Sequence, residues 1–414
     1  MMNLDKNLFY YIQGEGIDTS REPVLTSSAS AKVIHLFKEP NNLYHFYKNE
    51  GIEYESLNFV FNNWLLTETK FLKILIKEWF FLLSMGGNLI IRFEDTQNVN
   101  GDNIRQIVET YIGDYGEILY VKKDDDGFLT LIIQKLRSVL SEDDDITKWS
   151  FCIINQNNDS IKDLIKSIQT QGIPHYEIIV DNTNEEIQDE NIKMVDYSNY
   201  FNLSTSWKKN NFLLAAKYEN VVIIDRKKAN ITLEKNWFKE MEKYSNYFEC
   251  LSCAIITMDG SRYVDWWTLG CEKKFLKITK LGLLDYADWD EWVYFPDYIC
   301  ILKKGLYKKA LWDEYYEDGE GNIMLVHQLQ IKGSLLRLNP NLVCKVKDER
   351  VELLARNFPL YVFDSNKLGI IKKKTFRRAI WIIAEMIMGA RSSFILKPAI
   401  KILKFTRFYD LIAK

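Results

Sequence analysis

The feature that most constrains the fold is a series of apolar runs that each end on a polar residue. The run NVVIID at 220–225 ends on Asp225, and the runs WSFCIIN and HYEIIVD end on Asn155 and Asp181. Between these runs, DSIKDLIKSIQTQ and SWKKNNFLLAAKY have the spacing of amphipathic helices. Continuous apolar strands that alternate with helices indicate a largely parallel sheet with both faces covered. The sequence therefore predicts an α/β fold for this region.

Polar residues at neighbouring strand ends predict a ligand site. Ligands of open α/β sheets bind beyond the carboxyl ends of the strands. Asn155, Asp181 and Asp225 all lie at such ends, so two carboxylates and an amide would converge there. They could hold the base or ribose and the metal-bound diphosphate of a nucleotide. Strand ends are also polar simply because they meet water, and the spacing alone leaves both interpretations open.

The length of 414 residues predicts two or three domains. In the first 140 residues, strands are expected at 7–13, 32–37, 56–61 and 88–94, with a helix at 69–85 and a hairpin at 116–136. The acidic segment SEDDDITK at 141–148 is the expected boundary. We therefore expect a small Rossmann-like α/β domain at 1–140, a second α/β domain at 149–350 and a basic amphipathic helical tail at 351–414.

Composition and the N-terminal segment indicate which binding partners and which cellular compartment are expected. A net charge of -3 and a pI of about 6.0 give no case for nucleic-acid binding. The start MMNLDKNLFYY lacks the layout of a signal peptide, and the run AIWIIAEMIMGA carries Glu385 and is too short to span a bilayer. We expect a cytoplasmic protein. Strand alternation would put Cys250 and Cys253 on opposite faces, so both are expected to be buried, reduced thiols.

Four stretches carry a resemblance to a known family. The stretch FCIINQNNDSIKDLIKSIQTQGIPHYEIIVDNTN and the following WKKNNFLLAAKYENVVIID are similar to the opening of the family 2 glycosyltransferases of the GT-A fold. The later stretches NWFKEMEKY and MDGSRYVDWW resemble a bacterial surface-polysaccharide subgroup of that family. The likeness covers about 149–347 and is carried by Ser167, Ile168, Gln171, Glu177, Ile178, Ile179, Val180, Asp181, Lys209, Asn211, Ala216, Glu219, Asp225, Trp237, Phe238, Asp259, Gly260, Arg262, Asp265 and Trp266.

This resemblance implies an inverting glycosyltransferase of surface-polysaccharide biosynthesis, such as O-antigen or capsule. It would transfer a sugar from a nucleotide-diphosphate donor to a glycan or lipid-linked acceptor. Binding of the donor is implied for Asn155, Asp181, Lys209, Asp225 and Lys227. Asp225 would also bind Mn²⁺ or Mg²⁺, since a hard cation neutralises the leaving diphosphate. The acceptor would lie against Asp265, Trp266 and Tyr298.

The chain departs from the family pattern at the positions that carry chemistry. Lys227 stands where a second acid is expected, and Asn322 stands in the region of the catalytic base, with Glu320 and Asp318 nearby. Two interpretations stay open. Lys227 and its neighbours could stabilise the diphosphate without a metal, with Glu320 or Asp318 as the base. Alternatively, the domain is a catalytically inactive pseudo-glycosyltransferase that acts as a binding or scaffold module.

The N-terminal region has a resemblance of its own. The stretch LLSMGGNLIIRFE is similar to a segment of class I methyltransferases, and the hairpin expected at 116–136 fits that family. The methyl donor S-adenosylmethionine needs a glycine-rich turn after the first strand. The stretch YYIQGEGIDTS offers Gly14 and Gly16 alone. We therefore interpret this region as a degenerate, structural domain, with methyl transfer as the third candidate function.

The tail 367–414 is strongly basic, with Glu385 and Asp410 as its acids. Apolar residues such as Trp381 and Phe394 lie between the cations. This composition is typical of interfacial helices that bind anionic lipid, which would place the protein on the inner face of the cell membrane. Helices that pack on the second domain or on a partner subunit have the same composition, and both interpretations stay open.

Overall fold

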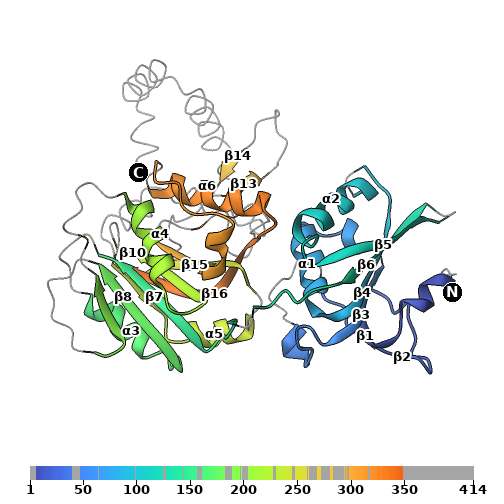
Figure 1. Cartoon of the computed structure of the whole chain (residues 1–414), viewed down its shortest axis with the longest axis horizontal. Coiled ribbons are helices and arrows are strands. Elements are labelled where there is room, and N and C mark those ends of the chain that lie inside the picture. Colours follow the sequence, from blue (N-terminus) through green and yellow to red (C-terminus); the bar gives the residue numbers. More distant parts are fainter. Residues whose placement is uncertain are drawn as a thin grey trace, which may run out of the picture.

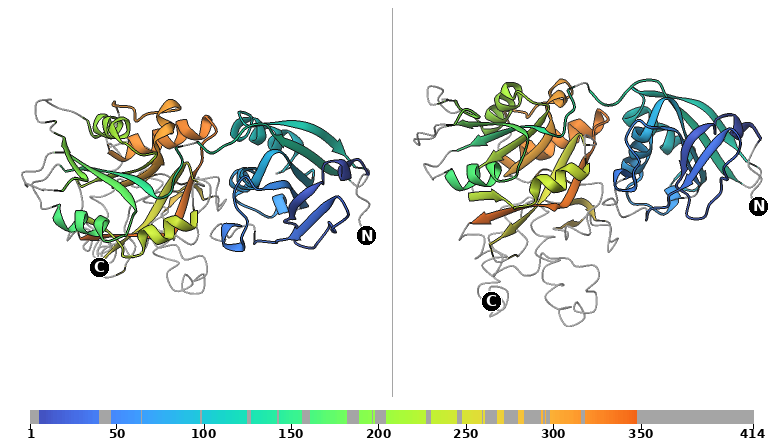
Figure 2. Two further views of the ribbon diagram at one scale, coloured as in Figure 1. Left: turned by 60° about the horizontal axis from the view of Figure 1, so that its bottom comes forward. Right: turned by 90° about the horizontal axis from the view of Figure 1, so that it is seen from below.

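The structure is a computed structural model. It describes residues 6–39, 47–63, 65–97, 99–124, 127–141, 143–155, 161–181, 189–195, 197, 204–226, 230–244, 248–258, 260, 268–271, 280–282, 293, 295, 298–315 and 318–347. Figure 1 shows two lobes side by side, each built around one large β-sheet. The views in Figure 2 show the same two bodies joined by a single connection. The predicted α/β class is confirmed.

The first sheet contains six strands of the described chain in the order β2-β1-β3-β4-β6-β5. Strands β1 to β4 pair with one another in parallel, and β6 runs antiparallel to both β4 and β5. The strands are β1 (Gly14–Asp18), β2 (Ala31–His35), β3 (Leu57–Asn63), β4 (Leu83–Glu94), β5 (Gly116–Lys123) and β6 (Phe128–Lys135). The order reverses at β1, which has β2 on one side and β3 on the other.

The two faces of the first sheet are covered differently. Helices α1 (Leu72–Leu82) and α2 (Gly101–Tyr111) pack on one face, together with the short helices η2 (Tyr47–Glu50) and η3 (Leu65–Thr67). The other face is covered by η1 (Lys6–Tyr10) and by Leu25 of the β1–β2 loop. In the described chain this face therefore carries no α-helix. Asn100 begins α2, because its side chain accepts a hydrogen bond from the backbone N–H of Asn103.

Most elements expected in this region are confirmed, with one exception, and two observed elements, β1 and α2, were not expected. The helix expected at 69–85, the strand at 88–94 and the hairpin at 116–136 are present. The strand expected at 7–13 is wrong, since this segment forms η1, from which Leu8 packs on the sheet. Strand β1 was not expected because its sequence, GEGID, contains two glycines. Gly16 is required there, since a Cβ would lie 2.4 Å from the carbonyl oxygen of Phe59.

The second sheet contains eight strands of the described chain in the order β11-β16-β12-β15-β10-β7-β8-β9. Strands β7 to β10 are parallel to their neighbours within this group. Strand β15 runs antiparallel to β10 and to β12. The strands are β7 (Lys148–Ile154), β8 (His175–Asp181), β9 (Ile192–Val195), β10 (Asn220–Asp225), β11 (Asn230–Leu233), β12 (Cys250–Thr257), β15 (Ile299–Lys303) and β16 (Leu336–Lys347), and β13 (Thr268–Cys271) pairs with β14 (Lys280–Gly282) separately.

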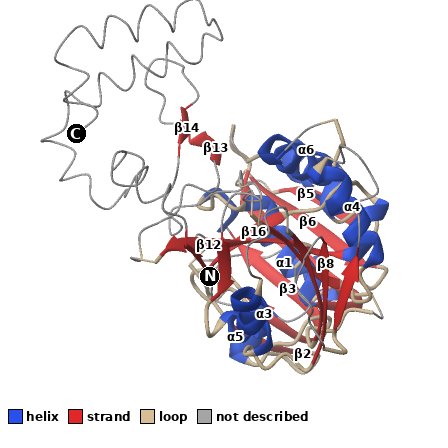
Figure 3. Cartoon of the chain, turned by 90° about the vertical axis from the view of Figure 1, so that its left-hand side faces the viewer, coloured by secondary structure: helices blue, strands red, loops and turns tan. Residues whose placement is uncertain are grey.

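Helices cover both faces of the second sheet, as the sequence predicts (Figure 3). Helices α3 (Lys162–Gln169) and α5 (Trp237–Tyr244) pack on one face. Helices α4 (Thr205–Ala215) and α6 (Asp318–Ile331) pack on the other face, with η5 (Lys304–Lys308) nearby. Ser204 begins α4 by accepting a hydrogen bond from the Trp207 N–H. Successive side chains of each buried strand point alternately into the two cores, so the face on which each side chain at a strand end lies is fixed.

The two lobes contact each other through charged groups. Lys77 of α1 donates to Glu249 Oε2 and to the carbonyl oxygen of Gly333, both at 2.6 Å. Gly333 lies against the end of α2, where an added Cβ would be 2.1 Å from the carbonyl oxygen of Thr110. The connecting segment is held by Glu55, which accepts from the N–H of Val139. These contacts fix one lobe against the other.

Candidate functional site

The carboxyl ends of β7, β8 and β10 bring together several predicted site residues. Asp181 is fully buried at the end of β8, and Lys208 of α4 donates to its Oδ2 at 2.5 Å. Asp181 therefore has a cation of the same lobe beside it. The family resemblance assigned donor binding to Lys209, but the residue that reaches Asp181 is the preceding lysine.

Asp225 closes β10, and its residue surface is 5% exposed. Its backbone N–H donates to the carbonyl oxygen of Tyr298 at 2.8 Å. The adjacent Arg226 donates to Asn155 Oδ1 at 3.2 Å and to Asn230 Oδ1 at 2.9 Å. The guanidinium thus bridges two strand ends within the lobe. Asp225, which was expected to face a diphosphate and a metal, is buried at this edge.

Asn322 of α6 is the centre of a third group of contacts. Its Oδ1 accepts hydrogen bonds from Lys209 Nζ at 3.1 Å and from Trp312 Nε1 at 2.9 Å. Trp312 is held in turn by Asn210, which bonds to its backbone N–H and carbonyl. Asn322 is fully buried. The residue at the position expected for catalytic acids therefore ties α6 to α4.

Other predicted residues lie elsewhere. Tyr298, expected to face an acceptor, is 7% exposed and belongs to the core on the α3 and α5 face. Asp318 and Glu320 begin α6, but their side chains lie outside the described residues. Lys227, Asp265, Trp266 and the tail 367–414 also lie outside them. Within the described chain, no helix is long and apolar enough to cross a membrane.

The first sheet has a second polar cluster at its carboxyl edge. Asp18, at the end of β1, is fully buried and accepts hydrogen bonds from the N–H groups of Ser20, Val24 and Leu25. These bonds, of 3.0, 2.7 and 2.9 Å, fold the β1–β2 loop back over the sheet. A carboxylate with three backbone donors organises a loop, in the manner of an Asx turn.

A hydrogen-bond chain crosses this edge from strand to strand. The Nε2 atom of His35, at the end of β2, lies 2.8 Å from the carbonyl oxygen of Ser20. The Ser20 hydroxyl accepts from the N–H of Asn63 at the end of β3. Arg92 of β4 donates to Asn63 Oδ1 at 3.1 Å and pairs with Asp124 at 3.1 Å. The edge is therefore polar over its whole width, and sequence reasoning did not identify it.

One atom of this edge lacks a hydrogen-bond partner in the described chain. Asn62 is fully buried in β3, and its Nδ2 donates to Thr19 Oγ1 at 3.0 Å. Its Oδ1 accepts no hydrogen bond from any described residue. Asn62 and Thr19 lie at the ends of β3 and β1, where the strand order reverses. A buried acceptor without a donor costs about 1–3 kcal/mol, so a ligand or water at this point would stabilise the lobe.

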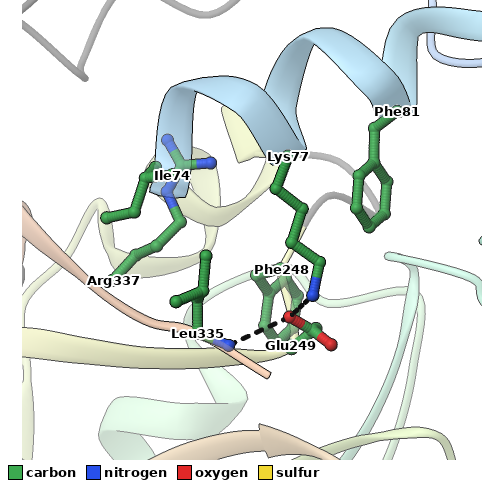
Figure 4. A pocket seen from close by; sticks show the side chains of 7 residues that line it. All are labelled: Ile74, Lys77, Phe81, Phe248, Glu249, Leu335 and Arg337. Atoms are coloured by element: carbon green, nitrogen blue, oxygen red, sulfur yellow. Dashed lines mark hydrogen bonds and ion pairs between the residues drawn. The ribbon is translucent and has the colours of Figure 1, made fainter. Parts of the chain in front are cut away.

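A small cavity lies between the lobes (Figure 4). It has a volume of about 20 Å³, enough for about one water molecule. Figure 4 shows Lys77 and Glu249 joined across it, with the Leu335 N–H also donating to Glu249. Burial lowers the pKa of Lys77, against the opposing charge of Glu249. Burial raises the pKa of Glu249, but the charges of Lys77 and Lys309 outweigh it and hold that pKa below its usual value. This region joins lobes and offers too little volume for a substrate.

Comparison with known proteins gives methyltransferases among the structural neighbours. No family model matches the chain, and no curated protein matches it. A SAM-dependent methyltransferase of Methanosarcina mazei has 17% identity over 33% of this chain and 99% of its own, with a TM-score of 0.22. Phosphoethanolamine N-methyltransferase 1 of Haemonchus contortus, with S-adenosylhomocysteine, has 9% identity over 52% and 73%, with a TM-score of 0.18. A 16S rRNA methyltransferase of T. thermophilus has 7% identity over 70% and 87%, with a TM-score of 0.23. These TM-scores are too low to carry an inference about activity.

The predictions of a glycosyltransferase and of polysaccharide biosynthesis are wrong. The neighbours found are methyltransferases. In the described chain Asp225 is buried, and Asp181 is paired with Lys208. The prediction of Mn²⁺ or Mg²⁺ at Asp225 is also wrong. In the described chain no three His, Cys, Asp or Glu side chains are grouped to hold a metal, and the Haemonchus contortus neighbour was solved with phosphoethanolamine and S-adenosylhomocysteine.

Proposed function

We propose that the chain is a transferase-type protein whose first lobe binds an adenosyl ligand of the S-adenosylmethionine class. The observation that carries the proposal is Asn62 Oδ1, a buried acceptor at the carboxyl edge of the first sheet that receives no hydrogen bond from the described chain. An adenine amine or a ribose hydroxyl would supply a donor to this atom. When bound, S-adenosylmethionine supplies an electrophilic methyl group.

The sheet order supports this location. In open α/β sheets, ligands bind where the strand order reverses, beyond the carboxyl ends. Here β1 pairs with β2 on one side and β3 on the other, both in parallel. Thr19 and Asn62 extend from the two strands that flank the reversal. Their hydroxyl and amide are neutral groups, as suits a nucleoside better than a free phosphate.

The residues present define how such a ligand would be held. Asp18 already accepts three N–H bonds, so its role is to shape the loop. Gly16 lies within β1 and packs against Phe59 of β3. It therefore does not form a phosphate-binding turn. Binding therefore depends on Asn62 as the acceptor and on Thr19 as the group that orients it. The loop that Asp18 anchors would exclude water from the ligand.

We also propose the division of the chain into domains at 1–140 and 149–350, followed by the tail 351–414. The separate sheets and the connection near 136–147 support this division. For the second domain we propose the GT-A architecture as a fold, without its chemistry. The support is a parallel group β7, β8 and β10 with helices α3 and α4 as connections.

Thermal unfolding with S-adenosylhomocysteine tests the proposed function. We expect the ligand to raise the Tm of the full chain and to release heat in calorimetry. Asn62→Leu removes the acceptor at nearly constant volume and should weaken binding about tenfold, the equivalent of about 1.4 kcal/mol. Asn88→Leu is the matched control, because Asn88 also has a buried Oδ1 without a partner in the described chain but lies where β4 pairs with the start of β3. Absence of any Tm shift in the wild-type chain would refute the proposal.

A further inference from the structure

Two buried thiols of the second sheet touch each other. Cys253 lies in β12 and Cys344 in β16, and their Sγ atoms are 3.7 Å apart. Both residues are fully buried in the core on the α3 and α5 face. A disulfide bond is about 2.05 Å long, so the two sulfur atoms are in contact without being bonded.

An irregularity in strand pairing brings these thiols together. Strands β12 and β16 pair in parallel, and the register changes between Cys253 and Ala254. Before the change, Cys253 lies opposite Asn339; after it, Ile255 lies opposite Cys344. The additional residues 340–342 of β16 move Cys344 into reach of Cys253. Such irregularities are local features that re-aim a side chain.

The neighbouring cysteines are separated from this pair by the sheet. Cys250 and Cys300 belong to the core on the α4 and α6 face, whereas Cys253 and Cys344 belong to the opposite one. The expectation that Cys250 and Cys253 lie on opposite faces is therefore confirmed. Cys344 is the cysteine that Cys253 contacts across the strands.

We propose that Cys253 and Cys344 form a reversible oxidation site at which a small peroxide closes a disulfide between β12 and β16. One thiolate attacks the peroxide O–O bond, becomes a sulfenic acid and releases the first water. The second thiol attacks that sulfur and displaces the hydroxyl as the second water. The two thiols give up two electrons and two protons, which reduce one hydrogen peroxide to two waters. This inference is independent of the proposed ligand.

The location gives the disulfide a structural effect. Strand β12 begins directly after Glu249, and β16 begins directly after Leu335, whose N–H donates to Glu249. Both strands therefore start at the contact with Lys77 of the first lobe. A bond between them limits how far the strands separate, so oxidation should raise the Tm of the second lobe. Because both thiols are buried, the reaction should be slow and should accelerate in mild urea.

The test uses the full chain treated with hydrogen peroxide in buffer and in urea below the unfolding midpoint. Remaining thiols are alkylated after denaturation, and peptides are identified by mass spectrometry. We expect a crosslinked pair of peptides that contains Cys253 and Cys344, with a mass about 2 Da below the sum of the two peptides. Dithiothreitol should reverse the crosslink. Cys344→Ala should abolish the crosslink, whereas Cys152→Ala, at a buried cysteine of the other face, should retain it. Full alkylation of both thiols after treatment, their conversion to sulfinic acids, or a crosslink of Cys253 to Cys250 would overturn the proposal.

Discussion

Replacement of Lys77 by methionine tests how strongly the two lobes hold each other. The Lys77 side chain is 4% exposed, and its Nζ lies 2.6 Å from Glu249 Oε2. Glu249 also accepts from Ser334 Oγ at 2.9 Å and from the Leu335 N–H at 3.1 Å. Lys77→Met keeps the aliphatic stem and removes the ammonium, so it leaves a carboxylate at the lobe interface without its closest cation.

The expected magnitude follows from burial. Removal of one partner of a buried ion pair typically costs about 3–5 kcal/mol. The Glu249 side chain retains 21% exposure, so water compensates in part. We therefore expect a loss at the lower end, about 3 kcal/mol, in the free energy of unfolding. At an unfolding entropy of about 2.1 cal/mol/K per residue, that loss corresponds to a Tm decrease of about 3–4 °C for the 414-residue chain.

Urea unfolding followed by far-UV circular dichroism measures this loss. The double variant Lys77→Met, Glu249→Leu should recover most of it, because it removes both charges and leaves apolar groups of similar volume. A single variant within about 0.5 kcal/mol of the wild type would refute the reasoning, since that is the range of ordinary surface substitutions. A double variant as unstable as the single one would show that packing of the lysine, and not its charge, holds the lobes.

Three further predictions concern stability. Gly333→Ala should cost about 1–3 kcal/mol more than the control Gly127→Ala in urea unfolding, because both have positive φ but only Gly333 has a backbone oxygen in the way of a Cβ; equal costs would contradict the close approach. Lys208→Met should cost about 3–5 kcal/mol, because it removes the ammonium beside the buried Asp181; a loss below about 1 kcal/mol in the same assay would contradict this ion pair. The folded state lowers the pKa of Glu249. The stability that this carboxylate contributes is therefore present above about pH 4.3 and is lost as the pH falls through its folded pKa. Glu249→Gln should flatten this acidic part of a stability–pH profile, and an unchanged profile would contradict the assignment.

In the second lobe, the strands could be predicted from the sequence where the apolar runs are continuous. The runs at 149–155 and 220–225 became β7 and β10 because every residue along them is buried or nearly so. The first lobe was less predictable. Strand β1 has the sequence GEGID, in which close packing on Phe59 outweighs the low strand propensity of glycine. Helix α2 begins at a clear Asn100 cap, a signal that could have identified it.

The site could be predicted only in part, because contacts depend on helix rotation. Consecutive residues of a helix are about 100° apart, so Lys208 reaches Asp181 while Lys209 reaches Asn322 on α6. A linear motif matches Lys209 and cannot distinguish these directions. The cluster of Thr19 and Asn62 joins residues 43 positions apart. Their proximity follows from the strand order, which the sequence alone did not supply.

Hydrogen–deuterium exchange with and without S-adenosylhomocysteine tests the central claim most directly. We predict slower exchange in peptides that cover Thr19 to Leu25 and the end of β3 around Asn62, with little change in the second lobe. Asn62→Leu should lose this protection, and Asn88→Leu should retain it. Unchanged exchange in those peptides at saturating ligand, or protection confined to the second lobe, would contradict a binding site at the carboxyl edge of the first sheet.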